Sequence, residues 1–464
     1  MSMRTVISNA EVDGRLVSVV IEDEIIAAID VHPPAGETGV IDANGAALIP
    51  GLHDHHVHLL AMAARDEGLD LDSLDDERAF DLALSHAADS AGGGWVRASG
   101  YDEHRHGQID CRRLDALVGA TKVRVQHRSG LAWVLSSAGL EAVLGDDNPA
   151  GVELDSSGRP TGRLLRLDTW LAERVGVAAP SLQNIGAQLS SFGVTGVTDA
   201  TYKLGAGRAE VLRQAVQNGS LPQSLTLLGV NDDDERAWIE GWASVGPVKI
   251  LVDEVVGLDV DLLAKRIEAH HRVGRAVAIH AVSRAETVTV ATAMALAGMM
   301  PGDRIEHGSV LPTDLDSLLA AGGVTVIVQP ALVSERGDHY LEVVDSEDLP
   351  FLHRAATLLE AGVRVAAGSD APVTSADPWR AIAAASTRTT RTGQRLGVAE
   401  RVEAATALGW YLTDPLDPSG PIRRVKVGTR ADLCLLDAPL TEVLADPNAS
   451  HVRNTWVRGR LVHS

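Results

Sequence analysis

Four histidines lie within six residues of one stretch near the start of the chain, directly after a Pro-Gly turn. The stretch reads Ile49-Pro50-Gly51-Leu52-His53-Asp54-His55-His56-Val57-His58-Leu59. Residues two apart on a β-strand share a face, so His56 and His58 converge on one point together with Asp54, whereas His53 and His55 face the opposite way. Because neutral imidazole is the usual nitrogen ligand of zinc and related divalent metals, this spacing indicates a metal site. A strand end whose imidazoles bond to water or backbone would give the same local pattern.

Further candidate ligands stand singly at the ends of apolar runs: His280, His307 and Asp370 each follow such a run. Each alone has an ordinary explanation, since most histidines are satisfied in a core or a loop and Asp370 could cap the next helix. Together with the first pair they predict that four imidazoles and a carboxylate meet at one site. Beside a metal, Asp370 could hold the ion and accept a proton from the attacking water.

Lys249 lies inside the apolar run 248–252, where a buried parallel strand is expected to be apolar on both faces. One explanation is an ion pair with Asp253 or Glu254. The other is that burial lowers the pKa of the amine, so that neutral Lys249 adds carbon dioxide and the resulting carbamate bridges two metals. The residues alone leave both explanations open.

The elements that would position these side chains are repeated β/α units, because short apolar runs alternate with longer helical patterns. Eight such units predict an α/β fold, a (β/α)8 TIM-like barrel, in which functional side chains come from the carboxyl ends of the strands. The expected strands lie in 49–59, 193–199, 225–230, 248–252, 276–280, 304–307, 324–329 and 364–370.

The two ends of the chain show short Val/Ile-rich runs separated by tight turns, and neither has enough apolar surface to fold alone. We expect residues 1–49 and 422–464 to combine into one composite β-sandwich beside a barrel formed by 50–421. The segment 59–189 is too long for one crossover and has strand-like runs of its own at 94–100 and 123–127. We therefore expect it to be an insertion that stands over the active site.

Composition narrows the class of protein. The net charge of −22 over 464 residues argues against nucleic acid or an anionic membrane as a partner. Two cysteines cannot form a disulfide framework, the first residues lack a signal-peptide pattern, and no apolar run approaches the roughly 20 residues of a membrane span. We expect a cytoplasmic protein with a small-molecule substrate, and leave assembly into a homo-oligomer open.

The motifs, taken in order, resemble those of the amidohydrolase superfamily, specifically the branch of metal-dependent hydrolases that includes N-substituted formamide deformylase. The resemblance covers nearly the whole chain. It rests on Pro50-Gly51-Leu52, Asp54, His56-Val57-His58, Pro160-Thr161-Gly162, Val248-Lys249-Ile250, His280-Ala281, Arg304-Ile305-Glu306-His307, Gly368-Ser369-Asp370-Ala371-Pro372-Val373 and Gly428-Thr429-Arg430-Ala431-Asp432-Leu433.

The resemblance implies a distorted barrel, a composite sandwich and one or two divalent metal ions, with zinc expected. By position it implies that His56 and His58 bind the more buried metal, Lys249 is the carbamylated bridge, His280 and His307 bind the second metal, and Asp370 is both ligand and general base. The chain departs from the branch at Asp253-Glu254-Val255 and at Leu131, where relatives often carry His. Candidate substrate-binding residues, expected in loops on the open side, are Arg128, Arg163, Arg336, His339 and Trp379.

The sequence therefore predicts a metal-dependent hydrolase that uses metal-activated water to cleave an amide, N-acyl or N-formyl C–N bond of a small molecule. One rival keeps the site and changes the bond, as in a deaminase or a lactone or ester hydrolase. A rival of another class is a catalytically silent barrel that serves as an assembly subunit.

Overall fold

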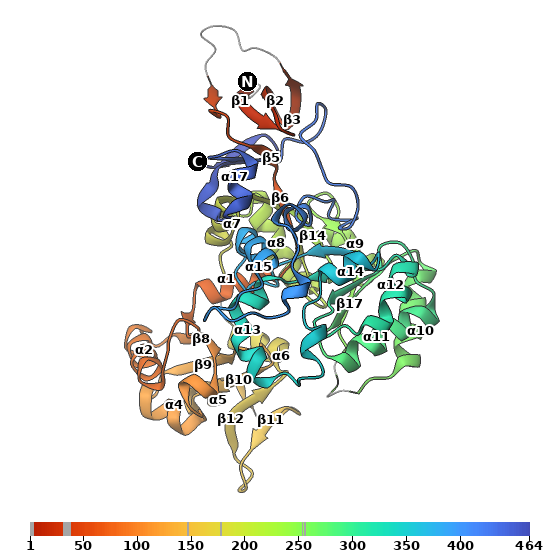
Figure 1. Ribbon diagram of the computed structural model, residues 1–464. Coiled ribbons are helices and arrows are strands. Elements are labelled where there is room, and N and C mark those ends of the chain that lie inside the picture. The colour runs from red at the N-terminus through yellow and green to blue at the C-terminus, as the bar shows by residue number, and fades with distance from the viewer. Residues whose placement is uncertain (1–3, 31–38, 146–147, 177–178, 253, 255–256) are drawn as a thin grey trace. The chain divides into compact units, whose positions relative to one another are not determined.

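The computed structural model describes residues 4–30, 39–145, 148–176, 179–252, 254 and 257–464. The chain divides into two compact units. Figure 1 labels the helices and strands of both. Unit 1 consists of Met1–Leu59 and Leu182–Ser464, and unit 2 of Leu60–Ser181.

Unit 1 contains two parallel sheets. The first has the order β15 (Ser244–Val245), β14 (Ser224–Leu227), β13 (Val194–Asp199), β6 (Leu52–Val57). The second has the order β16 (Val248–Ile250), β17 (Val277–Ala281), β18 (Arg304–His307), β19 (Thr325–Val328), β20 (Arg364–Ala367). All eight strands expected from the sequence are present, and β15 is an additional short one.

Backbone hydrogen bonds join the two sheets on both sides. Asp370 N donates to His56 O at 2.7 Å, and Lys249 N donates to Leu228 O at 2.9 Å. Few residues of β20 and β6 pair with one another. Strand β20 ends at Ala367, and Asp370 takes a left-handed backbone conformation with φ 56°. The expected parallel β/α architecture is therefore confirmed, but the strands of the described residues form two adjoining sheets rather than one closed eight-stranded barrel.

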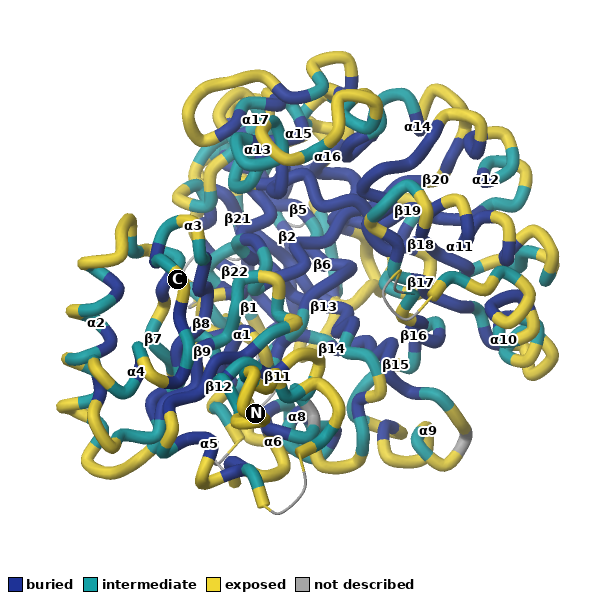
Figure 2. The backbone as a smooth tube through the Cα atoms, turned by 90° about the horizontal axis from the view of Figure 1, so that it is seen from below, coloured by how far each residue is buried: buried dark blue, intermediate teal, exposed yellow. Residues whose placement is uncertain are grey.

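Amphipathic helices follow the strands of both sheets. In α11 (Arg284–Ala297), Ser283 and Glu286 form a reciprocal capping box, and the buried Val290 and Met294 lie one turn apart. Figure 2 shows most strands of the two sheets as buried segments and the helices with many exposed residues. The other helices of unit 1 are α7 (Gln183–Ser191), α8 (Gly205–Asn218), α9 (Asp233–Ile239), α10 (Val260–Arg272), α12 (Asp316–Gly322), α13 (Ala331–Val343), α14 (Ala356–Glu360), α15 (Pro378–Thr387), α16 (Ala404–Gly409) and α17 (Leu440–Ala445).

Strands from both ends of the chain form two more sheets of unit 1. One has the order β3 (Ile25–Ile29), β2 (Arg15–Glu22), β1 (Arg4–Val12), β4 (Val40–Asp42); the other has the order β23 (Arg460–His463), β22 (Val452–Val457), β21 (Leu433–Leu436), β5 (Leu48–Pro50). Both contribute to one buried apolar cluster, in which Ile7 and Ile21 from the first meet Leu48, Leu433 and Trp456 from the second.

Unit 2 is built on a six-stranded sheet with helices on both faces. The strand order is β11 (Val152–Leu154), β12 (Pro160–Leu165), β10 (Ala132–Leu135), β9 (Lys122–His127), β8 (Trp95–Tyr101), β7 (Leu69–Asp70). One apolar cluster includes residues of α2 (Glu77–Ser90) and α4 (Cys111–Val118), and another includes residues of α5 (Ser137–Val143) and α6 (Asp168–Val175). The two strand-like runs noted in the sequence are β8 and β9.

Among the described residues, every helix is too short or too polar to cross a lipid bilayer.

Candidate metal centre

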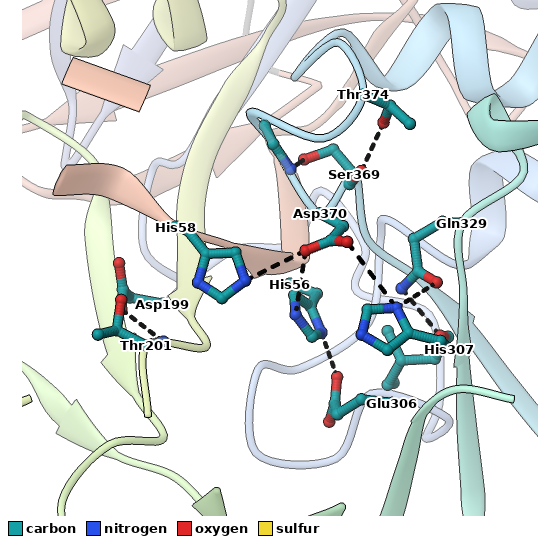
Figure 3. A network of polar contacts seen from close by, with 12 residues as sticks. His56, His58, Asp199, Thr201, Glu306, His307, Gln329, Ser369, Asp370 and Thr374 are labelled. Carbon is teal, nitrogen blue, oxygen red and sulfur yellow. Dashed lines mark hydrogen bonds and ion pairs between the residues drawn. The ribbon is translucent and has the colours of Figure 1, made fainter. Parts of the chain in front are cut away.

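Three buried side chains of unit 1 offer ligand atoms that lie within 4.8 Å of one another: His56, His307 and Asp370. His56 lies in β6, His307 is the last residue of β18, and Asp370 follows β20. The cluster therefore uses both parallel sheets, at the edge where their carboxyl ends meet (Figure 3).

The Asp370 carboxylate is at the centre of the cluster. Its Oδ1 lies 3.1 Å from His58 Nε2 and 3.5 Å from His56 Nε2, and its Oδ2 lies 4.0 Å from His307 Nδ1. Burial raises the pKa of Asp370, but His307, the hydrogen bond from His58 and the charge of His56 outweigh burial and hold the pKa below its usual value. The carboxylate is thus ionised at neutral pH.

A carboxylate on the neighbouring strand orients His56. Glu306 accepts a hydrogen bond from His56 Nδ1 and is held by Arg304, whose Nη2 donates to Glu306 Oε2 at 3.1 Å. Burial raises the pKa of Glu306, but the charges of Arg304, His56 and Lys249 hold it well below its usual value. With the proton on Nδ1, the lone pair of His56 is on Nε2, a buried atom without a hydrogen-bond partner among the described residues.

His307 has a similar partner in Gln329. The Gln329 amide donates from Nε2 to Ile327 O at 3.0 Å, which leaves Oε1 to accept from His307 Nδ1, also at 3.0 Å. The lone pair of His307 is then on Nε2. The unpartnered Nε2 of His56 and the His307 imidazole, beside an ionised carboxylate, are the kind of donor set that a divalent ion such as zinc prefers, so the residues present fit a metal ion.

His280 and Lys249 lie next to this cluster. The ring centroid of His280 is 4.7 Å from that of His307. Burial and then the charge of Lys249 lower the pKa of His280 to about 3. Lys249 is 2% exposed, and burial lowers its pKa although Glu306 and Asp370 act in the opposite direction.

Of the two carboxylates that we considered as ion-pair partners of Lys249, only Glu254 is among the described residues, and it contacts a different side chain. Asp253 lies outside the described residues, as does Val255. Glu254 accepts a hydrogen bond from Ser283 Oγ. The sequence departure at 253–255 therefore has a structural description only at Glu254.

The backbone around the cluster is closely packed and partly strained. A Cβ on Gly368 would lie 2.6 Å from His56 N, so a larger residue there would separate β6 from the Asp370 loop. His307 and Asp370 have positive φ angles of 74° and 56°, which cost roughly 1–2 kcal/mol each outside glycine. Asp54 connects the two segments by accepting from His56 N and Ser369 N, both at 3.0 Å.

The remaining histidines of β6 bond away from the cluster, as strand alternation predicts. His53 Nε2 lies 2.8 Å from Thr198 Oγ1, and His55 Nε2 lies 2.9 Å from Thr413 Oγ1. Burial lowers the pKa of both well below the usual value. They are neutral core histidines.

Comparison with known proteins gives the family. The profile of the amidohydrolase family matches residues 39–463. The chain belongs to this family.

Individual relatives agree with the assignment. The amidohydrolase is similar to the N-substituted formamide deformylase of Arthrobacter pascens, with 26% identity over 519 aligned positions that cover 97% of this chain and 93% of the relative. A solved, uncharacterized metal-dependent hydrolase from Pyrococcus horikoshii has a TM-score of 0.73 at 19% identity and covers 94% of this chain and 97% of that one. The structure of N-isopropylammelide isopropylaminohydrolase from Burkholderia multivorans has a TM-score of 0.51 at 16% identity, covering 99% and 98%.

The expectation of an enzyme that hydrolyses carbon–nitrogen bonds other than peptide bonds is confirmed at the level of this family.

The candidate substrate-binding residues of the amidohydrolase are spread over both units. In unit 2, Arg128 is ion-paired with Asp102 after β9, and Arg163 lies in strand β12, where its guanidinium donates to Ile109 O at 3.0 Å. The loop position expected for Arg163 was therefore wrong. The loop positions expected for the other three were also wrong, because all three lie in helices of unit 1.

Arg336 and His339 lie in α13, and Arg336 Nη2 donates to Val373 O at 3.0 Å, three residues after Asp370. Trp379 lies in α15 with no exposed surface, and its indole N–H donates to Phe192 O at 3.0 Å. Trp379 packs in the core and has no surface to offer a substrate.

Sequence reasoning missed the roles of Arg304, Glu306 and Gln329. A signal was present for Arg304 and Glu306, because two charged residues in a four-residue buried strand must compensate one another or bind a partner. Their pairing with His56 depends on a contact between distant strands, which no local pattern gives.

Proposed function

We propose that this amidohydrolase is a metal-dependent enzyme that cleaves an amide, N-acyl or N-formyl C–N bond of a small molecule. The observation that carries the proposal is His56 Nε2, a buried nitrogen that has no hydrogen-bond partner among the described residues and lies 3.5 Å from Oδ1 of Asp370. The likeness to a formamide deformylase over nearly the whole chain supports the choice of bond.

The proposed ligands are His56, His58, His280, His307 and Asp370, with zinc as the expected ion. When bound, a divalent metal lowers the pKa of a water molecule and polarises a carbonyl oxygen. Asp370 would accept the proton of the attacking water and deliver it to the leaving nitrogen. Glu306 and Gln329 would fix the tautomers of His56 and His307.

Lys249 is the proposed site of a carbamate. Its lowered pKa favours the neutral amine, whose nitrogen would form a bond to the carbon of CO2 and release one proton. The product is an anion with two oxygens. It would replace a buried positive charge with a negative one beside the histidines and thereby admit one or two cations.

A substrate panel tests the proposed bond. Chelator-treated protein, with and without added Zn²⁺, is assayed on N-formyl amines, N-acetyl amines, lactones and amino-substituted heterocycles. We expect amine release from the first two classes, only with metal. Ammonia release from the heterocycles, or turnover of lactones alone, would overturn the assignment of the bond. A protein that neither binds metal nor turns over any substrate would support the assembly-subunit alternative.

Reconstitution tests the carbamate. Zinc uptake by metal-free protein should require bicarbonate, and Lys249→Ala should bind less zinc, with partial rescue by a small carboxylic acid. Lys265→Ala, at an exposed position of α10, is the matched control. Equal zinc uptake without bicarbonate would show that Lys249 acts unmodified.

A further inference from the structure

Unit 2 contains two arginines side by side on neighbouring strands. Arg97 in β8 and Arg124 in β9 are direct partners in the parallel register, so their side chains leave the same face of the sheet from backbones about 4.8 Å apart. They share this face with Trp133 of β10, and both guanidinium carbons lie near its ring, 5.5 and 5.7 Å from the centroid.

Neither guanidinium group forms a hydrogen bond or ion pair with any side chain or backbone group that the structure describes. Among the residues that the structure describes, the Nε atoms of Arg97 and Arg124 are buried without a hydrogen-bond partner, and so is Oγ of Ser99, two residues after Arg97 on the same face. Arg124 is 8% exposed. Burial and the charge of Arg97 lower the pKa of Arg124 to about 10, a value at which it is still charged at neutral pH.

Other arginines of unit 2 do have hydrogen-bond or ion-pair partners. Arg128 is paired with the Asp102 carboxylate, and Arg163 donates to a backbone carbonyl and to Gln108. The Trp133 ring attracts a cation through its π face, but the in-plane N–H donors of a guanidinium still require oxygen acceptors. The buried Arg124 and the partly buried Arg97 also repel one another, although the charges of Asp168 and Glu67 act favourably on Arg97. An anion between the two guanidinium groups would reduce this repulsion and supply the missing acceptors.

We propose that Arg97, Arg124 and Ser99 bind a small oxyanion, a carboxylate or phosphate group, beside Trp133. A planar or tetrahedral oxyanion accepts paired N–H bonds from guanidinium groups, and the serine hydroxyl can donate a further bond. All residues of the site belong to unit 2, and the proposal does not depend on the proposed hydrolysis. The ligand is a free small anion or the anionic group of a larger small molecule.

Calorimetry and thermal unfolding of the full-length protein test this proposal. Inorganic phosphate and acetate are added at constant ionic strength against chloride. We expect at least one of them to bind and to raise Tm by several degrees, and the response to each identifies the kind of oxyanion. No heat of binding and no Tm change with either anion would overturn the proposal.

Matched variants locate the site. Arg124→Met should weaken anion binding by roughly tenfold or more and, without anion, melt no lower than the wild type, since a repelling buried charge is replaced by an apolar side chain. Arg97→Met is a second variant should the first not fold. Arg112→Met removes an arginine of α4 whose side chain is 74% exposed and should bind as the wild type does. Anion binding by Arg124→Met and Arg97→Met at wild-type strength would contradict the assignment.

Discussion

Glu306 is hydrogen-bonded to Nδ1 of His56, although 250 positions separate them in the sequence. Glu306 belongs to one parallel sheet and His56 to the other. The bond gives His56 the tautomer that can bind a metal through Nε2, and Arg304 balances the buried carboxylate. The carboxylate–imidazole arrangement is the kind that raises the basicity of a metal ligand.

Replacing Glu306 with Gln should weaken zinc binding by roughly 10–100-fold, because the charge that polarises His56 is lost. The affinity is measured by competition with a chromogenic chelator, and Glu342→Gln, an exposed position of α13, is the control. Glu306→Gln leaves Arg304 buried and unpaired, so it should also destabilise the fold. Adding Arg304→Met should restore stability but not zinc affinity. Recovery of both would mean that Glu306 acts only on the fold.

Asp370→Asn should reduce kcat by about 10²–10⁴-fold, since an amide cannot accept the proton of the attacking water. The thermal melt should stay cooperative. Turnover is measured on the best substrate of the panel, with zinc content determined on the same sample. Asp314→Asn, an exposed position, should behave as the wild type. Near-normal turnover by Asp370→Asn would assign the base to another residue.

Deletion of residues 1–45 should make the protein insoluble. The deletion removes β1 to β4 and uncovers Leu48, Leu433 and Trp456, each at most 1% exposed in the intact chain. Burying such side chains contributes about 1.5–3 kcal/mol each. The soluble fraction and the melting curve provide the measurement. A soluble truncation with one cooperative transition would show that the C-terminal sheet does not need the N-terminal one.

His353 should make stability depend on pH. Burial, followed by the charge of Arg388, lowers its pKa from 6.5 to about 3. Between these values the unfolded chain binds a proton that the folded chain does not, so stability present above pH 6.5 is lost as the pH falls toward 3.

The contribution of one such group is at most about 1.4 kcal/mol per pH unit. His353→Asn should reduce the slope of unfolding free energy against pH by that order, measured by chemical denaturation from pH 4.5 to 6.5. Asn tolerates the positive φ of 50° at this position. An identical slope in both proteins would show that His353 protonates normally in the folded state.

The sequence predicts what depends on local periodicity and little of what depends on distant pairing. Strands such as β13 and β17 follow from their apolar runs, and the two faces of β6 follow from alternation of its histidines. The contact between β20 and β6 cannot be predicted in this way, because its geometry is set by the left-handed backbone at Asp370 and the close approach of Gly368 to His56. These are properties of two segments brought together.

The same limit applies to individual side chains. Trp379 was expected in a loop, yet Asp377 and Pro378 begin the helix that contains it, and its side chain is buried. Arg97 and Arg124 lie in two separate short runs with no spacing relation. Their shared environment arises only when β8 and β9 pair.

The cluster of His56, His307 and Asp370 also has a consequence for biosynthesis. His56 is made early and Asp370 late, and backbone bonds between their segments join the two parallel sheets. A ribosome must therefore translate and release most of the chain before the proposed ligands can meet. Metal supply in the cell would act only after the segment that contains Asp370 has been made, and a chain stalled before β20 would have the histidines but not Asp370.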